Sequence, residues 1–191
     1  MNNREFSLLH RILHWTIALG LMFILVTIFL RLNWMAKEHT AQIIQQQLTE
    51  VNISLQTSQA VKIGKAIRKP MWEWHIYIGY ILFGLYLLRI IYIAVKGFQF
   101  DSPFSSGNNK MEKVQFWVYL GFYFFLGISL ITGMLIVNGP EGIHDIAETI
   151  HKPSLLWLIL FLILHFGGLI KGEYGPKQGI VSKMISGKDC K

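Results

Sequence analysis

The sequence has little charge and almost no cysteine. Only 15% of its 191 residues are Asp, Glu, Lys or Arg, whereas 52% are apolar. Soluble domains carry about 25% charged residues, so this composition excludes an ordinary soluble domain and a disordered chain. The single cysteine, Cys190, has no second cysteine to pair with, which excludes an internal disulfide framework. We therefore expect a membrane protein in contact with membrane lipid.

Acidic residues are also scarce, with 11 against 18 basic residues and a formal net charge of +7. In a soluble protein this excess could indicate a nucleic-acid partner. Here the apolar residues are gathered in long blocks, and basic residues beside such blocks report topology or contact lipid headgroups. We therefore predict no nucleic-acid partner.

Four stretches are apolar enough and long enough to cross a bilayer, which requires roughly 20 residues. They cover residues 12–32, 75–95, 114–137 and 153–170. The sequence thus predicts an all-α membrane protein, a four-transmembrane-helix bundle that forms a single domain over residues 1–191.

An even number of spans places both termini on one side. That side carries eleven basic and five acidic residues, the other side seven and six, so we predict that both termini are cytoplasmic.

The loop at residues 33–74 is the longest segment outside the spans. Ile44, Leu48, Val51 and Leu55 recur at the spacing of one helical face. We expect an amphipathic helix that packs over the outer ends of the spans, with the docking of a partner as the alternative.

Four histidines lie within spans or at their ends: His14, His75, His151 and His165. Ionisable groups in a membrane span are costly and are functional candidates by default. His39 and His144 are predicted to lie in loops, and we assign them no role.

The depths of these four histidines predict two pairs. His151 and His165 are 14 residues apart on an expected continuous helix, hence roughly 21 Å apart along it and within roughly 40° of one face. His14 begins the first span on the side of His165, and His75 begins the second span on the side of His151. We therefore expect His14 with His165 in one layer and His75 with His151 in the other.

Two imidazoles that face each other from neighbouring helices suit the axial ligation of haem. The sequence therefore predicts two haems b, each bound by two histidines. Gly79, four residues after His75, leaves room for a porphyrin. Zinc and di-iron sites fit less well, because the spans supply no carboxylate or thiolate. A non-redox channel or scaffold, in which the histidines only form hydrogen bonds, is a further alternative.

Arg89 is the charged residue within the second span. It follows His75 by 14 residues, so it shares that face at the depth of the other histidine pair. A buried arginine there requires an anion, which a haem propionate would supply. The alternative is that Arg89 extends to the headgroups.

His10 could contact a headgroup or a propionate. Five basic residues are expected to surround the outer haem, which is the haem of His75 and His151 on the side away from the termini. We expect them to offset its propionates rather than attract an anionic substrate: Lys62, Lys65, Arg68, Lys69 and Lys152.

These residues also form a family pattern that covers all four spans. The segment from Arg11 to Trp15 resembles the R-x-x-H-W opening of the bacterial cytochrome b561 and nickel-iron hydrogenase cytochrome b superfamily. The remaining matches are His75-x3-Gly79-x9-Arg89, Tyr123-x9-Gly133 and His151-x13-His165. Some members carry histidines early in the third span, where this chain has Phe116 and Tyr119.

The resemblance implies a di-haem b-type cytochrome of the bacterial inner membrane. Such a protein transfers electrons within or across the membrane, to or from quinone or quinol, and it could act as a quinone-linked oxidoreductase. The alternative is a membrane-anchor subunit that exchanges electrons with a redox partner protein, in a hydrogenase- or dehydrogenase-type complex.

Overall fold

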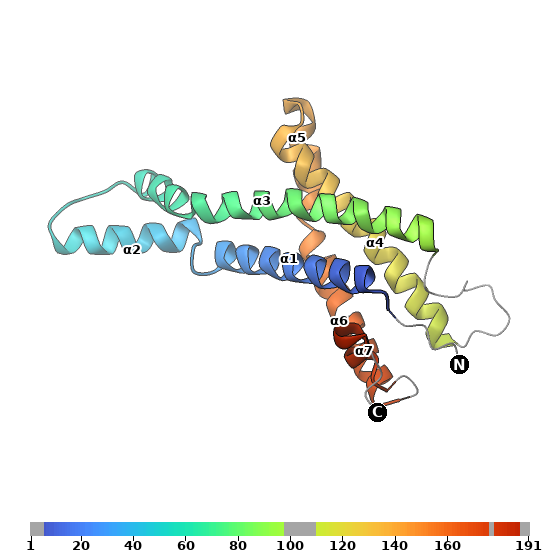
Figure 1. Ribbon diagram of the computed structural model, residues 1–191. Helices are drawn as coiled ribbons and strands as arrows, with labels where there is room; N and C mark the ends of the chain where they lie inside the picture. Colours follow the sequence, from blue (N-terminus) through green and yellow to red (C-terminus); the bar gives the residue numbers. More distant parts are fainter. Residues whose placement is uncertain (1–5, 98–109, 176–177, 188–191) are drawn as a thin grey trace. The chain divides into compact units, whose positions relative to one another are not determined.

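The computed structural model describes residues 6–97, 110–175 and 178–187, and every regular element in these ranges is an α-helix (Figure 1). The helices are α1 (Leu8–Leu32), α2 (Lys37–Glu50), α3 (Thr57–Lys96), α4 (Lys110–Asn138), α5 (Glu141–His151), α6 (Ser154–Glu173) and α7 (Ile180–Ser186). By length and hydropathy, four helical segments can cross a membrane: Leu8–Leu32, Thr57–Lys96, Lys113–Asn138 and Glu141–Glu173. The predicted all-helical protein with four spans is therefore confirmed.

The chain divides into two compact units. One unit is Leu19–Ile81, and the other consists of Met1–Ala18 together with Leu82–Lys191. The helices α1 and α3 each run from one unit into the other. The single domain expected over residues 1–191 stays a prediction.

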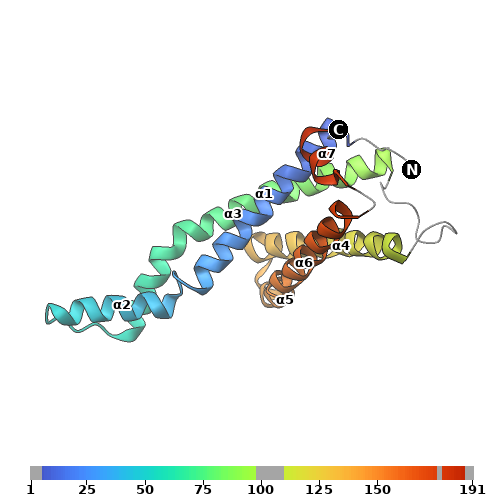
Figure 2. The same cartoon turned by 90° about the horizontal axis from the view of Figure 1, so that it is seen from below.

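In the Leu19–Ile81 unit, α2 packs beside the first turns of α3, as both views show (Figures 1 and 2). Gly64 permits this close approach, because a Cβ atom there would stand 3.0 Å from the carbonyl oxygen of Lys37 and 3.3 Å from the Cβ of Thr40. A hydrogen bond stabilises the turn between the helices: Nε2 of Gln45 on α2 donates to the carbonyl of Leu55 at 2.9 Å. The two helices thus form an antiparallel hairpin.

This hairpin corrects two expectations for residues 33–74. The expected helix exists as α2 but ends at Glu50, so Val51 and Leu55 do not continue its face. The chain turns at Asn52, which has a positive φ of 58°, a conformation that asparagine tolerates better than most residues. The rest of the segment from Thr57 onward is helical and continues without interruption into the second span.

Two further expectations are wrong. His39 and His144 lie in helices, α2 and α5, and not in loops. The fourth span is also not one continuous helix, because α5 ends at His151 and α6 begins at Ser154. Pro153 explains the break, since it lacks an N–H group and its ring would clash with the carbonyl of the preceding turn. The separation of His151 and His165 that we calculated for a straight helix therefore does not apply.

In the other unit, aromatic rings join α4 to α6. Phe122 stacks on Phe161 with ring centres 4.0 Å apart, and Phe125 stacks on Trp157 at 4.5 Å. The short helix α7 lies against the first turns of α1, where Arg11 and Trp15 donate side-chain hydrogen bonds to carbonyl groups of α7. These contacts belong to the unit that contains the histidines of α1, α5 and α6.

Candidate haem-binding site

His14 and His165 face each other across α1 and α6. Their ring centres are 6.2 Å apart, and the ring planes are tilted by 42°. A metal–imidazole bond is about 2 Å long, so a metal held between two imidazoles places the ring centres about 6 Å apart. Both rings are half-buried. The spacing and the donor set of this pair therefore fit axial ligation of one iron.

His151 is held by two groups on α4. Its Nδ1 lies 2.9 Å from the carbonyl oxygen of Ser129 and 3.3 Å from Oγ1 of Thr132. A carbonyl oxygen only accepts, so Nδ1 carries the proton and donates it. The other ring nitrogen, Nε2, is then the unprotonated atom that a metal can bind. This is the arrangement in which a metal-binding histidine is usually oriented.

His75 is oriented in the same way from α1. Its Nδ1 lies 2.8 Å from Oγ1 of Thr27, whose hydroxyl donates to the Ile24 carbonyl at 2.7 Å. Because that hydroxyl has only one hydrogen, its oxygen accepts from His75, which again leaves Nε2 unprotonated. Thr27 is only 2% exposed, so water does not compete for this bond.

An aromatic stack supports the face of His75. Trp72, one turn earlier on α3, lies parallel to the imidazole with ring centres 4.4 Å apart and planes 9° apart. On Trp72 in turn lies the guanidinium of Arg31, with its carbon 4.2 Å from the ring centre. Packing on one face and the Thr27 bond at one edge thus restrict the imidazole to a single orientation.

His165 has a hydroxyl partner on α4. Its Nδ1 lies 3.2 Å from the hydroxyl of Tyr119, and its ring stacks on Phe161 at 5.4 Å. Tyr119 thus contacts a predicted ligand from another helix. Three of the four candidate ligands therefore use Nδ1 for a protein contact, and in His75 and His151 this contact leaves Nε2 available.

Arg89 is buried, with 8% of its surface exposed, and its described partners are uncharged side chains. Its Nε donates to the Tyr123 hydroxyl at 3.1 Å. Its two terminal nitrogens lie 3.0 and 3.3 Å from Nδ1 and Nε2 of His10. A neutral imidazole has one acceptor nitrogen, so only one of these two contacts can be a hydrogen bond. The guanidinium therefore keeps donor capacity for an anion, and its burial does not favour the headgroup alternative.

Two glycines define the space around the histidines. A Cβ atom on Gly133 in α4 would stand 3.1 Å from Cε1 of His151, so any side chain here would require the imidazole to shift. At Gly79, no atom of the described residues lies within 4 Å of where a Cβ would stand. Gly79 thus leaves open space one turn after His75.

The structure brings His14 and His165 together. His75 belongs to the Leu19–Ile81 unit and His151 to the other unit, so their pairing stays a prediction. Sequence reasoning did not identify the residues that orient the rings, namely Thr27, Trp72, Tyr119 and Thr132. One signal was available, because hydroxyl groups within apolar spans require partners just as histidines do.

The comparison with known families extends over nearly the whole chain. The family described as prokaryotic cytochrome b561 matches residues 5–187. No curated protein and no solved structure matches the chain. The match includes all four spans and all four candidate ligands. The chain therefore belongs to the prokaryotic cytochrome b561 family, whose members are membrane proteins that transfer electrons by means of haem b.

Proposed function

We propose that this protein is a di-haem cytochrome b that transfers electrons across the bacterial inner membrane, to or from quinone or quinol. The facing rings of His14 and His165 are the observation that carries the proposal. In it, His14 and His165 bind one haem, and His75 and His151 bind the second. Both termini lie in the cytoplasm, in accordance with the greater number of basic residues on their side.

Two histidines on each iron would leave no open coordination position for a substrate or oxygen. Haem b bound in this way supplies a reversible one-electron couple between ferric and ferrous iron. The residues of this chain would hold the group, exclude water and set its potential through their hydrogen bonds. Electron transfer is therefore favoured over chemistry at the metal.

Arg89 and His10 would bind a propionate of the haem held by His14 and His165. His10 lies one helical turn before His14 on α1, and its ring contacts the buried guanidinium. The donor capacity that Arg89 keeps beyond His10 and Tyr123 suits a carboxylate. Burial makes such a charge-assisted bond stronger than the same bond in water.

A second candidate function is that of a membrane-anchor subunit of a hydrogenase- or dehydrogenase-type complex. The hairpin of α2 and the first part of α3 favours it, because this hairpin extends beyond the predicted span at 75–95. Exposed apolar side chains on the hairpin, such as Ile43 and Ile63, could contact a redox partner protein.

Difference spectroscopy tests the proposal. The spectrum of the dithionite-reduced protein minus that of the oxidised protein should show a b-type α-band that corresponds to two haems per chain. A quinol should reduce the same haems in the protein purified alone. Absence of an α-band would contradict haem binding and favour the channel or scaffold. Reduction only in the presence of a co-purified catalytic subunit would favour the anchor.

The bond between Thr27 and His75 gives a further prediction. Thr27→Val keeps the shape of the side chain but removes the acceptor of the Nδ1 proton, so the imidazole becomes less basic and less firmly oriented. We expect about tenfold weaker binding of the haem held by His75, by the usual effect of such partners. The midpoint potential of that haem should rise, because a less basic ligand stabilises ferric iron less.

The matched control is Thr49→Val, since the Thr49 hydroxyl is exposed and bonds only within its own helix. Redox titration and haem release to an acceptor protein measure both effects. Identical potentials and release rates in the two variants would show that Thr27 does not orient an iron ligand.

A further inference from the structure

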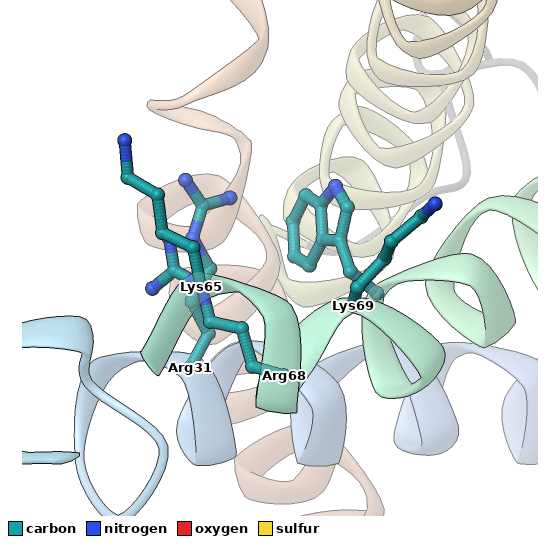
Figure 3. A pocket seen from close by; sticks show the side chains of 5 residues that line it. Arg31, Lys65, Arg68 and Lys69 are labelled. Atoms are coloured by element: carbon teal, nitrogen blue, oxygen red, sulfur yellow. The ribbon is translucent and has the colours of Figure 1, made fainter. Parts of the chain in front are cut away.

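A basic pocket lies in the Leu19–Ile81 unit, where α1 ends and α3 approaches its apolar part. It has a volume of about 210 Å³ and is lined by Arg31, Lys65, Arg68, Lys69 and Trp72. Figure 3 shows Arg31 from α1 near Lys65 and Arg68 of α3, with Lys69 further along α3. Four cations thus share one pocket.

The charges in this pocket are only partly neutralised. Lys69 lies 3.8 Å from Glu73, and the nearby Glu38 lies 3.2 Å from Lys37, outside the pocket. Within the described part of the chain, no carboxylate lies within 4.0 Å of Lys65 or Arg68. The pocket therefore has a net positive charge that an anion would offset.

One of the cations is held in place before any ligand binds. The guanidinium carbon of Arg31 lies over the Trp72 ring, 4.2 Å from its centre, and Trp72 is itself stacked on His75. This cation–π contact restricts where the guanidinium can lie, and the guanidinium is a planar group with five N–H donors. A planar set of donors in a fixed position suits a phosphate group.

The pocket lies near the ends of two membrane-spanning segments, close to the expected depth of the lipid headgroups. Arg31 is the last residue but one of the first membrane-spanning helix. On α3, Lys65 and Arg68 precede His75 by ten and seven residues, which is about 15 and 10 Å along the axis. The headgroup layer lies directly outside the hydrocarbon core, and the long side chains of lysine and arginine can extend toward it from the water side.

Exposed aromatic residues lie just beyond the end of α1 and, on α3, between the pocket and the apolar part of the helix. Trp34 and Trp74 are exposed, with 71% and 57% of their surfaces accessible, and Tyr77 lies beside Trp74 with ring centres 6.0 Å apart. Exposed tryptophan and tyrosine gather where the bilayer meets water. These residues indicate that the membrane–water boundary lies next to the basic pocket, which favours a ligand that comes from the membrane.

We propose that this pocket binds the phosphodiester headgroup of an anionic phospholipid. Lys65 and Arg68 contact the phosphate, and the Trp72-stacked Arg31 supplies planar donors to it. A volume of about 210 Å³ corresponds to about seven water molecules of about 30 Å³ each, which accommodates a phosphate and part of its glycerol. In this proposal Lys65, Arg68 and Lys69 face a lipid phosphate, whereas from the sequence alone they were expected to offset haem propionates.

Lipid binding by the purified, haem-containing protein in detergent tests the proposal. Phosphatidylglycerol should raise the thermal denaturation temperature and remain bound in native mass spectra, whereas phosphatidylcholine should do neither. Each cation near a membrane surface contributes to the binding of anionic lipid, so Lys65→Gln and Arg68→Gln should each weaken binding of phosphatidylglycerol about fivefold. Arg68→Lys keeps the charge and should retain most of the affinity.

Lys62→Gln is the matched control, because Lys62 is an exposed lysine one turn before Lys65 that does not line the pocket. Equal weakening in this variant would overturn the site and leave only general surface charge. A stabilisation by inorganic phosphate as large as that by phosphatidylglycerol would assign the pocket to a free anion. Loss of haem, with unchanged lipid binding, in the Lys65→Gln and Arg68→Gln variants would assign it to a propionate and also overturn the proposal.

Discussion

Replacing either His14 or His165 by alanine is expected to remove the same haem, so that the haem content falls from two per chain to one. The two rings face each other with centres 6.2 Å apart, and alanine has no nitrogen to bind iron. Because both ligands serve one iron, the loss of the second ligand adds nothing to the loss of the first. The double variant should therefore contain as much haem as either single variant.

Haem assayed as its pyridine complex, together with the reduced-minus-oxidised spectrum, measures this result. His39→Ala is the control, since His39 is exposed on α2 and its variant should keep both haems. If the two single variants each retained one haem but the double variant retained none, the two histidines would belong to different haems. The pairing drawn from their geometry would then be wrong.

Gly133→Leu is expected to remove the other haem. Even the first side-chain atom at this position would stand 3.1 Å from Cε1 of His151, and the rest of a leucine side chain would occupy the place of the ring. His151 would lose its bond to the Ser129 carbonyl and could not present Nε2. We expect one haem per chain, with the haem of His14 and His165 retained.

Two variants sharpen this test. Gly121→Leu places the same side chain on the same helix, at a position where no atom of the described residues lies within 4 Å of the new Cβ. Both substitutions gain about 1 kcal/mol of helix propensity, so a difference between them reports the contact with His151. Gly133→Ala should give an intermediate loss, because the ring needs to move only by a few tenths of an ångström. Two haems in Gly133→Leu would contradict a ligand role for His151.

Combining Gly133→Leu with His14→Ala distinguishes two sites from one. We expect a protein without haem, since the variants act on different pairs. Retention of one haem in this combination would mean that both changes affect a single site. The assignment of His151 to a different haem from that of His14 is thereby tested in solution.

The spans were predictable from local composition, because a stretch of about 20 apolar residues has few alternatives to crossing a bilayer. The break in the fourth span was less evident. Pro153 was visible in the sequence, but the apolar stretch around it continued, and Glu141–His151 was not recognised as helical because acidic residues interrupt it. Only the helical hairpin of α4 with α5 explains why that segment is ordered.

The candidate ligands were predictable as well, since four histidines in an apolar setting are conspicuous. Their hydrogen-bond partners were not. Tyr119 and Thr132 lie 46 and 19 residues from the histidines that they contact, and no periodicity along one helix indicates which face of another helix it meets. The same limit applies to Arg89, for which the sequence suggested only an anion. The structure adds His10 as a partner of Arg89, and the two residues are 79 positions apart.

The sequence by itself thus determined that this chain crosses the membrane four times, belongs to the b-type cytochromes and carries four candidate ligands. Hydrophobic burial and the cost of ionisable groups in lipid depend on local composition, so they can be read along one helix. The tertiary structure decided which ring nitrogen remains available, which glycine accommodates an imidazole and which cations share a pocket. These features depend on side chains that meet across helices, and their distances follow only from packing.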